Sequence, residues 1–381
     1  MGWRDWQIGR VLGIPIKVHA SWFLVFTFVT WSLATGYLPE ALPHLSAVRY
    51  WGMGAIAALL LFVSVLLHEL GHSYVALRYH IPIGQITLFV FGGMAQMRRE
   101  PPGPRAEFLI AIAGPIVSFV LGGLCLGGVE LLEARQGSPG FLVLGSLLGA
   151  VNLQLGLFNL IPGFPLDGGR VLRAGLWAWS GDFFRATQRA SLAGQGFGLA
   201  FGLLGAGLLI GVAAGFLPVP LAANAGWIIL IGGFLFAAAK GTRRQAALRA
   251  SLASVSVGEV MISRVVALDA PMSVEEAVSQ YFSPYGYGAF PVWADGHLVG
   301  MVSIQDVQGL APNLWRWRQV QDIMQPWTPD METTPATPAV DALEQMVRQG
   351  QHRLAVIQDG HLVGLVTRSG INRFLQLRGL R

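Results

Sequence analysis

Two histidines and a glutamate fall within five consecutive residues, His68-Glu69-Leu70-Gly71-His72. On a helix, positions four apart share one face, so His68 and His72 could bind a single zinc ion. Glu69 would lie beside that face, where it could take a proton from a water molecule activated by the metal. Because a catalytic zinc ion usually has three protein ligands, the pattern predicts a hydrolytic site that needs one more ligand.

The best candidate for that ligand is Asp167, in the proline- and glycine-rich segment 158–170. Two prolines and three glycines prevent this segment from forming a regular helix to its end. Irregular backbone at membrane depth is tolerated where it is buried in protein or lines a wet cavity, and an acid at such a break is a functional candidate. The alternative is that Asp167 caps a helix beside Gly168-Gly169.

The histidine motif lies in strongly apolar sequence. Glu69 is the only Asp, Glu, Lys or Arg between Arg49 and Arg78, and residues 136–166 contain none. Only 12% of the 381 residues are charged, against about 25% in soluble domains. The motif HExxH also occurs by chance, but a charge-free stretch that carries two histidines and a carboxylate predicts hydrolysis inside a bilayer.

Apolar stretches of about 20 residues can span a bilayer, and the sequence contains six of them. Leu217-Pro218-Val219-Pro220 separates the last two, because prolines end one helix and permit a turn. The predicted spans are residues 19–38, 50–77, 108–129, 141–162, 190–215 and 221–239. We therefore predict a polytopic α-helical membrane domain of about six transmembrane helices.

Arginine and lysine residues are unevenly distributed between the two ends of these spans. Fifteen fall on the side that carries both chain ends, whereas Arg49 and Arg135 fall on the other. Since cytoplasmic loops are enriched in positive residues, we predict a multi-pass protein of the cell membrane with both termini in the cytoplasm. His68 would then lie roughly 15 Å from the cytoplasmic end of its span, a depth that Asp167 also approaches.

Two motifs of this sequence match those of a known family. The matching residues are His68-Glu69-Leu70-Gly71-His72, Asn159, Pro162, Pro165 and Asp167-Gly168. Together they resemble the site-2 protease family of intramembrane zinc metalloproteases, over residues 50–175. The resemblance implies that His68, His72 and Asp167 bind zinc (Zn2+) and that Glu69 is the general base. It also implies that Asn159 holds the substrate backbone or stabilises the oxyanion; the alternative is a buried polar link between spans.

The same family carries a re-entrant β element after the metal helix. Residues 85–97 fit it, since they are rich in β-forming residues and are interrupted by Gly92-Gly93. An exposed strand edge could pair with an unwound substrate segment and hold it extended. We expect residues 86–97 to have this role.

Residues 250–381 have the composition of a soluble domain and contain an internal repeat. Gly296-His297-Leu298-Val299-Gly300 recurs as Gly360-His361-Leu362-Val363-Gly364. The repeat resembles a tandem pair of CBS domains, which is an α/β module. The expected organisation is a transmembrane metalloprotease domain at 1–240, a linker at 241–256, and CBS repeats at 257–312 and 319–381.

CBS pairs commonly bind adenine nucleotides in the clefts between their repeats. In that family a Ser or Thr at the end of a strand contacts phosphate, and an Asp three residues later contacts the ribose. Ser303 and Asp306 keep this pattern, whereas Thr367 is followed by Gly370, so one site is expected to be lost or altered. ATP, ADP or AMP is therefore an expected ligand; the alternative is a homodimerisation module without a ligand.

These patterns predict an intramembrane zinc endopeptidase that cuts a transmembrane or juxtamembrane segment of a single-pass membrane protein. The resemblance implies regulated proteolysis, which nucleotide binding could modulate. A CBS-gated transporter would not account for HExxH together with Asp167, and a catalytically silent relative would require a broken triad. The net charge is +5, but no cluster of basic residues with interleaved aromatics occurs, so no nucleic-acid partner is expected.

Overall fold

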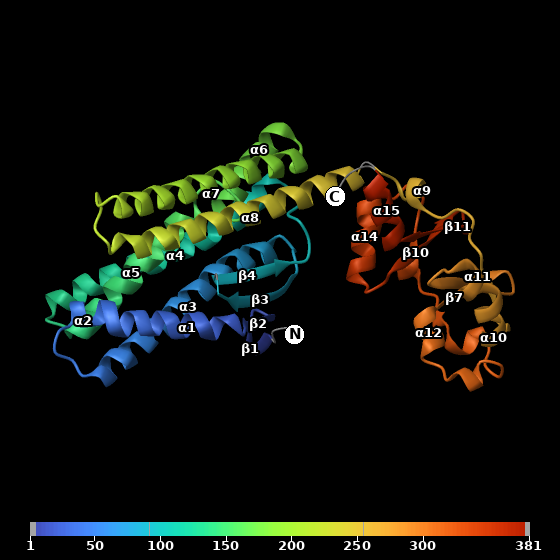
Figure 1. Cartoon of the computed structure of the whole chain (residues 1–381), viewed down its shortest axis with the longest axis horizontal. Helices are drawn as coiled ribbons and strands as arrows, with labels where there is room; N and C mark the ends of the chain where they lie inside the picture. The colour runs from blue at the N-terminus through green and yellow to red at the C-terminus, as the bar shows by residue number, and fades with distance from the viewer. Residues whose placement is uncertain (1–4, 91, 254, 378–381) are drawn as a thin grey trace. The chain divides into compact units, whose positions relative to one another are not determined.

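The structure, a computed structural model, describes residues 5–90, 92–253 and 255–377. The chain folds into two compact units, Met1–Ala246 and Ala247–Arg381. Figure 1 shows the helices and strands of each unit along the chain.

Among the described residues, the structure has six helices that are long and apolar enough to cross a membrane. They are α1 to α2 (Ser21–Ala41), α3 (Ala47–Arg78), α4 (Pro104–Ala134), α5 (Pro139–Asn159), α7 (Phe183–Ala213) and α8 (Leu221–Ala253). The first of them consists of α1 (Ser21–Ser32), the π-helical turn η1 (Leu33–Tyr37) and α2 (Leu38–Ala41). The prediction of a six-helix membrane domain is confirmed.

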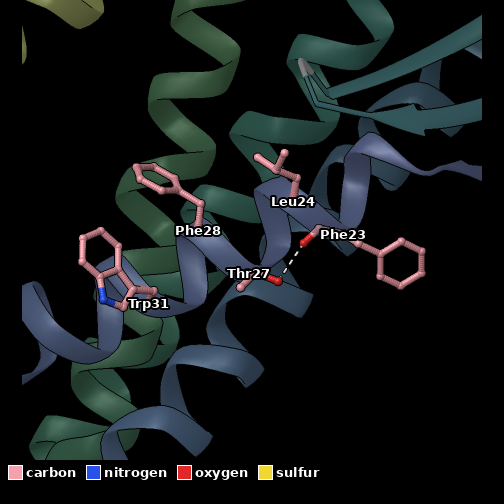
Figure 2. Close-up of a pocket in the computed structure, with 5 residues that line it drawn as sticks. All are labelled: Phe23, Leu24, Thr27, Phe28 and Trp31. Carbon is pink, nitrogen blue, oxygen red and sulfur yellow. Dashed lines mark hydrogen bonds between the residues drawn. The ribbon is translucent and has the colours of Figure 1, made fainter. Parts of the chain in front are cut away.

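The outer faces of these helices present large apolar side chains. Figure 2 shows Phe23, Leu24, Phe28 and Trp31 projecting from α1, and each is at least half exposed. The hydroxyl of Thr27 on this face donates to the Phe23 carbonyl at 2.8 Å, so it presents no unpaired donor. Such a surface suits lipid, which cannot satisfy exposed polar groups.

Glycines allow the helices to approach one another closely. A Cβ at Gly122 of α4 would lie 2.8 Å from Leu153 of α5, and one at Gly149 of α5 would lie 2.6 Å from Leu126. Gly198 of α7 is equally tight against the Phe236 backbone of α8. Membrane helices associate through this kind of close packing, because lipid is as apolar as their side chains.

A four-stranded sheet lies against α3. Its order is β1-β2-β3-β4, with β2 parallel to β3 and the other pairs antiparallel. Buried Ile14, Ile16 and Ile86 of the sheet pack on Leu66 and Leu70 of α3. The strands are β1 (Asp5–Val11), β2 (Ile14–His19), β3 (Ile83–Phe89) and β4 (Gly92–Met97).

The hairpin of β3 and β4 occupies the segment that was expected to form a β element; Phe91, between its strands, lies outside the described residues. The β1–β2 hairpin was not expected. Its signal is the alternation of Ile14, Ile16 and Val18, which are all buried while their neighbours are not.

One short helix also differs from the expectation. α6 (Asp167–Ser180) forms after the non-helical segment 160–166, whereas no helix was predicted between the fourth and fifth spans. The predicted break after the fourth span is therefore present, and it ends at Asp167.

The C-terminal unit repeats one hairpin. β6 (Ala289–Ala294) and β7 (His297–Ser303) turn at Asp295-Gly296, and β10 (Arg353–Gln358) and β11 (His361–Thr367) turn at Asp359-Gly360. All four turn residues have positive φ, and both hairpins have a register shift at the equivalent place. Such two-residue turns suit the twist of antiparallel strands, and the predicted α/β repeat is confirmed.

The remaining elements complete each repeat around its own apolar core. The short strands are β5 (Leu268–Asp269), β8 (Gln325–Pro326) and β9 (Glu332–Thr333). The helices are α9 (Val257–Val260), α10 (Val274–Ala277), η2 (Val278–Phe282), α11 (Ser283–Tyr285), α12 (Ile304–Gln308), η3 (Pro312–Leu314), α13 (Val320–Ile323), η4 (Pro329–Met331), α14 (Ala339–Arg348) and α15 (Arg368–Leu377). Most of the predicted linker 241–256 is helical, because α8 continues to Ala253.

Candidate functional site

The two histidines of the motif are buried on one face of α3. His72 Nδ1 lies 2.6 Å from the carbonyl oxygen of Ile110, and His68 Nδ1 lies 2.8 Å from Ser118 Oγ, both on α4. A carbonyl can only accept, so Nδ1 of His72 carries a proton, and in the neutral ring Nε2 keeps a lone pair. Hydrogen bonds of this kind orient histidines that bind metals.

Asp167 is the first residue of α6, where the amide dipoles of the helix favour a negative charge. Tight packing fixes this end of α6: a Cβ on Gly168 or Gly169 would come closer than 3.0 Å to backbone atoms of residues 160–164.

The structure brings the three predicted ligands together. Asp167 Oδ2 lies 3.0 Å from His68 Nε2 and 3.1 Å from His72 Nε2, and the two nitrogens are 3.2 Å apart. Ligand atoms of a tetrahedral zinc ion with bonds near 2.0–2.1 Å are separated by about 3.3 Å. Since a carboxylate also faces an imidazole lone pair, the donor set fits a divalent cation.

Gly114 of α4 makes room for this arrangement. A Cβ at this position would come closer than 3.0 Å to Nε2 of both histidines. The space in front of the ligand atoms is therefore kept open by the absence of a side chain.

Glu69 lies beside the edge strand of the sheet. Its Oε2 accepts a hydrogen bond from the Ala95 amide of β4 at 3.2 Å. A Cβ on Gly93 would lie 2.5 Å from Glu69 Cγ, so β4 and the carboxylate are in close contact. The candidate general base and the candidate substrate strand thus form one local structure.

The structure does not place Asn159 in hydrogen-bond contact with these groups. Its amide nitrogen donates to the Leu155 carbonyl of its own helix at 3.0 Å. A different asparagine, Asn152, is the buried polar link between spans, donating to Ser64 Oγ of α3 at 3.0 Å. The predicted role of Asn159 in catalysis stays a prediction.

Several residues around the centre were missed by sequence reasoning. They are Glu107, Ile110, Gly114 and Ser118 on α4, and Arg170 and Arg173 on α6. Glu107 could have been suspected, because it is an acid at the start of a transmembrane span, where a charge needs a partner.

A cleft of about 670 Å³ opens in the C-terminal unit. Thr367 and Gly370 line it together with Arg353, Arg368 and Arg373. Burial lowers the pKa of Arg353, and Asp306 opposes that shift; an arginine still remains charged. The cleft is therefore positively charged and has no aspartate at the position of Gly370.

Ser303 and Asp306 do not line this cleft, although their pattern was the more complete one. They form a reciprocal cap at the start of α12, in which the Ser303 amide donates to Asp306 Oδ2 at 2.7 Å. The same residue spacing serves a helix cap, so the motif alone does not decide between capping and ligand binding.

Comparisons with known proteins agree with these observations. A profile described as Peptidase family M50 matches residues 56–139 and 127–205, and a CBS domain profile matches residues 257–311 and 320–377. The chain is 36% identical to a Synechocystis protein named as zinc metalloprotease sll0528, over 97% of this chain and 95% of that protein. It is 34% identical to Rip3 of Mycobacterium tuberculosis, also named as a zinc metalloprotease, over 97% and 92% respectively.

A solved site-2 protease from Methanocaldococcus jannaschii is 33% identical, with a TM-score of 0.43, and covers 63% of this chain and 95% of that one. The family resemblance is confirmed by the two full-length relatives and the profile matches. The chain belongs to peptidase family M50, the site-2 protease family, and is a multi-pass membrane zinc metalloprotease with a C-terminal pair of CBS domains.

Proposed function

We propose that this protein is an endopeptidase that cuts within or beside a transmembrane segment of a single-pass membrane protein. The observation that carries the proposal is the buried triangle of His68, His72 and Asp167 atoms with Glu69 on the same helix. The triangle lies among apolar spans, so the scissile bond must come to it at membrane depth. Family resemblance supports regulated proteolysis as the setting.

Each residue of the centre has a separate role in this proposal. His68, His72 and Asp167 would hold zinc, which would supply a Lewis acid and lower the pKa of water, so that hydroxide is available near neutral pH. Glu69 takes the proton of the attacking water and passes it to the leaving amine. The Ala95 amide holds the Glu69 carboxylate in place for both steps.

The substitution Glu69→Gln tests this assignment. It keeps the shape and the hydrogen bond to Ala95 but removes the base, so cleavage is lost while zinc is retained. Comparing membranes that contain wild type or Glu69→Gln identifies substrates as proteins that accumulate uncut in the variant. Cleavage that continues in Glu69→Gln would contradict the role, and so would loss of zinc.

We further propose that β4 receives the substrate as an added strand. β4 is the last strand of the sheet, and its outer side has no strand partner among the residues described. Backbone pairing there would hold the substrate extended beside Glu69. Replacing Gly93 of β4 by proline would not test strand pairing alone. The added Cβ would collide with Glu69, so the general base would be disturbed as well.

A photo-crosslinking side chain at Met94, which is half exposed on β4, gives a cleaner test. In the Glu69→Gln background it should capture the uncut substrate. The same side chain at Leu203, which is exposed on α7, is the matched control and should not. Equal capture at both positions would contradict strand pairing.

We propose that both termini are cytoplasmic. Two of the fifteen arginines and lysines that suggest this orientation, Arg170 and Arg173, are engaged with Glu107 inside the protein. The remaining thirteen still outnumber Arg49 and Arg135. A reporter that is active only in the cytoplasm should be active at either end of the chain.

We propose a second function for the C-terminal unit, the binding of ATP, ADP or AMP in the cleft around Thr367. Its arginines offer charge-assisted hydrogen bonds to phosphates. In a titration of the full chain, Arg353→Gln should weaken nucleotide binding, whereas Arg316→Gln, outside the cleft, should not. If no nucleotide binds, a homodimerisation role for the CBS pair becomes the better account.

A further inference from the structure

A buried carboxylate ties α4 to α6 close to the candidate metal centre. Glu107, in the first turn of α4, has no solvent exposure. Its Oε1 accepts hydrogen bonds from Arg170 Nε at 3.0 Å and from Arg173 Nη2 at 2.5 Å. A buried charge is costly unless it is paired, so the two arginines of α6 are held to this point of α4.

The two arginines that pair with Glu107 lie on the same helix as Asp167, the third candidate ligand. Asp167 opens α6, Arg170 follows one turn later and Arg173 two turns later. A shift of α6 along or around its axis would move Asp167 as well. The ion pairs therefore fix the distance between α4 and the carboxylate.

α4 also positions the other two ligands. The carbonyl of Ile110 and the hydroxyl of Ser118 orient His72 and His68, and Gly114 lies directly against both rings. α4 thus positions the imidazoles directly and the Asp167 carboxylate through Glu107.

Arg173 is fixed on further sides by aromatic rings. Its guanidinium carbon lies 5.0 Å from the ring centre of Phe164 and 4.7 Å from that of Phe183. Phe164 belongs to the non-helical segment that leads into Asp167. Within the described residues, Glu107 is the carboxylate that neutralises this stacked cation.

We propose that Glu107 is a positioning residue of the metal centre: its ion pairs to Arg170 and Arg173 hold Asp167 against His68 and His72. The inference rests on the proposed role of those three residues as metal ligands. A merely structural ion pair would stabilise the fold and leave the ligand geometry unchanged, and this difference can be measured.

The test uses the full chain purified in detergent. Zinc affinity is measured by competition with a chelator, the ligand geometry by the absorption bands of the Co2+-substituted protein, and stability by thermal unfolding. Glu107→Gln should weaken zinc binding by roughly ten- to a hundred-fold, the usual effect of removing an outer partner of a ligand, and should change the Co2+ bands.

The matched control is Gly198→Ala, which places a Cβ 2.6 Å from the Phe236 backbone between α7 and α8. It should lower the unfolding temperature without changing zinc affinity or the Co2+ bands. If Glu107→Gln behaves like this control, the positioning role is refuted.

Should Glu107→Gln not accumulate as folded protein, Glu107→Asp and Arg170→Lys give the same readout with the charges kept. Each should weaken zinc binding more than Gly198→Ala does at a similar loss of stability, and an equal effect would refute the inference. Wild-type protein without zinc affinity would instead refute the proposed ligands themselves.

Discussion

His72 illustrates how single hydrogen bonds decide the chemistry of the candidate centre. The Ile110 carbonyl fixes the tautomer of the ring and leaves the Nε2 lone pair facing Asp167 Oδ2 at 3.1 Å. Two acceptors at this distance repel each other unless a cation lies between them. The protein thus maintains a site whose own electrostatics favour a bound metal.

At this scale we predict that Gly114→Ala removes zinc binding and cleavage together. The added methyl group would come closer than 3.0 Å to both Nε2 atoms and displace the ligands. Gly123→Ala on the same helix is the control, because its Cβ would meet nothing within 4 Å among the residues that the structure describes. It should keep activity and gain up to about 1 kcal/mol of helix stability. Metal analysis of both proteins checks this, and zinc retained in Gly114→Ala would contradict it.

At the scale of the element, the segment 160–166 and the start of α6 pack together as one local structure. Close backbone contacts hold them: Gly163 meets Gly194 of α7, and Gly169 meets the chain at Gly163 and Phe164. The Asp167 carboxylate is therefore positioned by a tightly packed, non-helical segment between the membrane helices. The backbone here is irregular but enclosed by protein, which is the condition for its stability at membrane depth.

We predict that Gly194→Ala impairs both stability and catalysis. Its Cβ would come closer than 3.0 Å to the Phe164 backbone, so the segment before Asp167 must move. Overpacking of this kind costs about 1–3 kcal/mol, and a misplaced ligand lowers the cleavage rate further. Gly196→Ala, whose Cβ would meet no described residue within 4 Å, should resemble wild type. Equal cleavage rates in the two variants would be inconsistent with this account.

At the scale of the whole molecule, the chain combines a unit built for lipid with one of soluble composition. The lipid-facing character is visible on α1, where large apolar side chains are exposed (Figure 2). The C-terminal unit instead encloses separate apolar cores in each repeat. The candidate metal ligands and the positively charged cleft thus belong to different units.

The membrane assignment predicts that two substitutions of Phe28 differ strongly in their effect on membrane insertion. Phe28→Leu should insert normally, whereas Phe28→Asp should reduce insertion, since a carboxylate at a helix centre costs about 3 kcal/mol. The fraction of protein recovered in membranes measures both variants. Equal recovery would mean that this face of α1 does not contact lipid.

Sequence alone predicted those parts of the site that depend on local pattern. The spacing of His68 and His72 is a property of one helix, and the break before Asp167 is a property of its prolines and glycines. Gly114, Ser118 and the other α4 contacts depend on how two helices cross, which local pattern does not encode. Arg170 and Arg173 resembled loop charges because nothing nearby in the sequence marks Glu107 as their partner.

The metal stoichiometry of the purified chain tests the central claim most directly. Wild type and Glu69→Gln should each contain about one zinc ion per chain, whereas His72→Ala and Asp167→Ala should contain almost none. All four proteins must first unfold cooperatively, so that a loss of metal is not a loss of fold. Zinc that remains in Asp167→Ala and His72→Ala, or is missing from folded wild type, would contradict a metal centre built from α3 and α6.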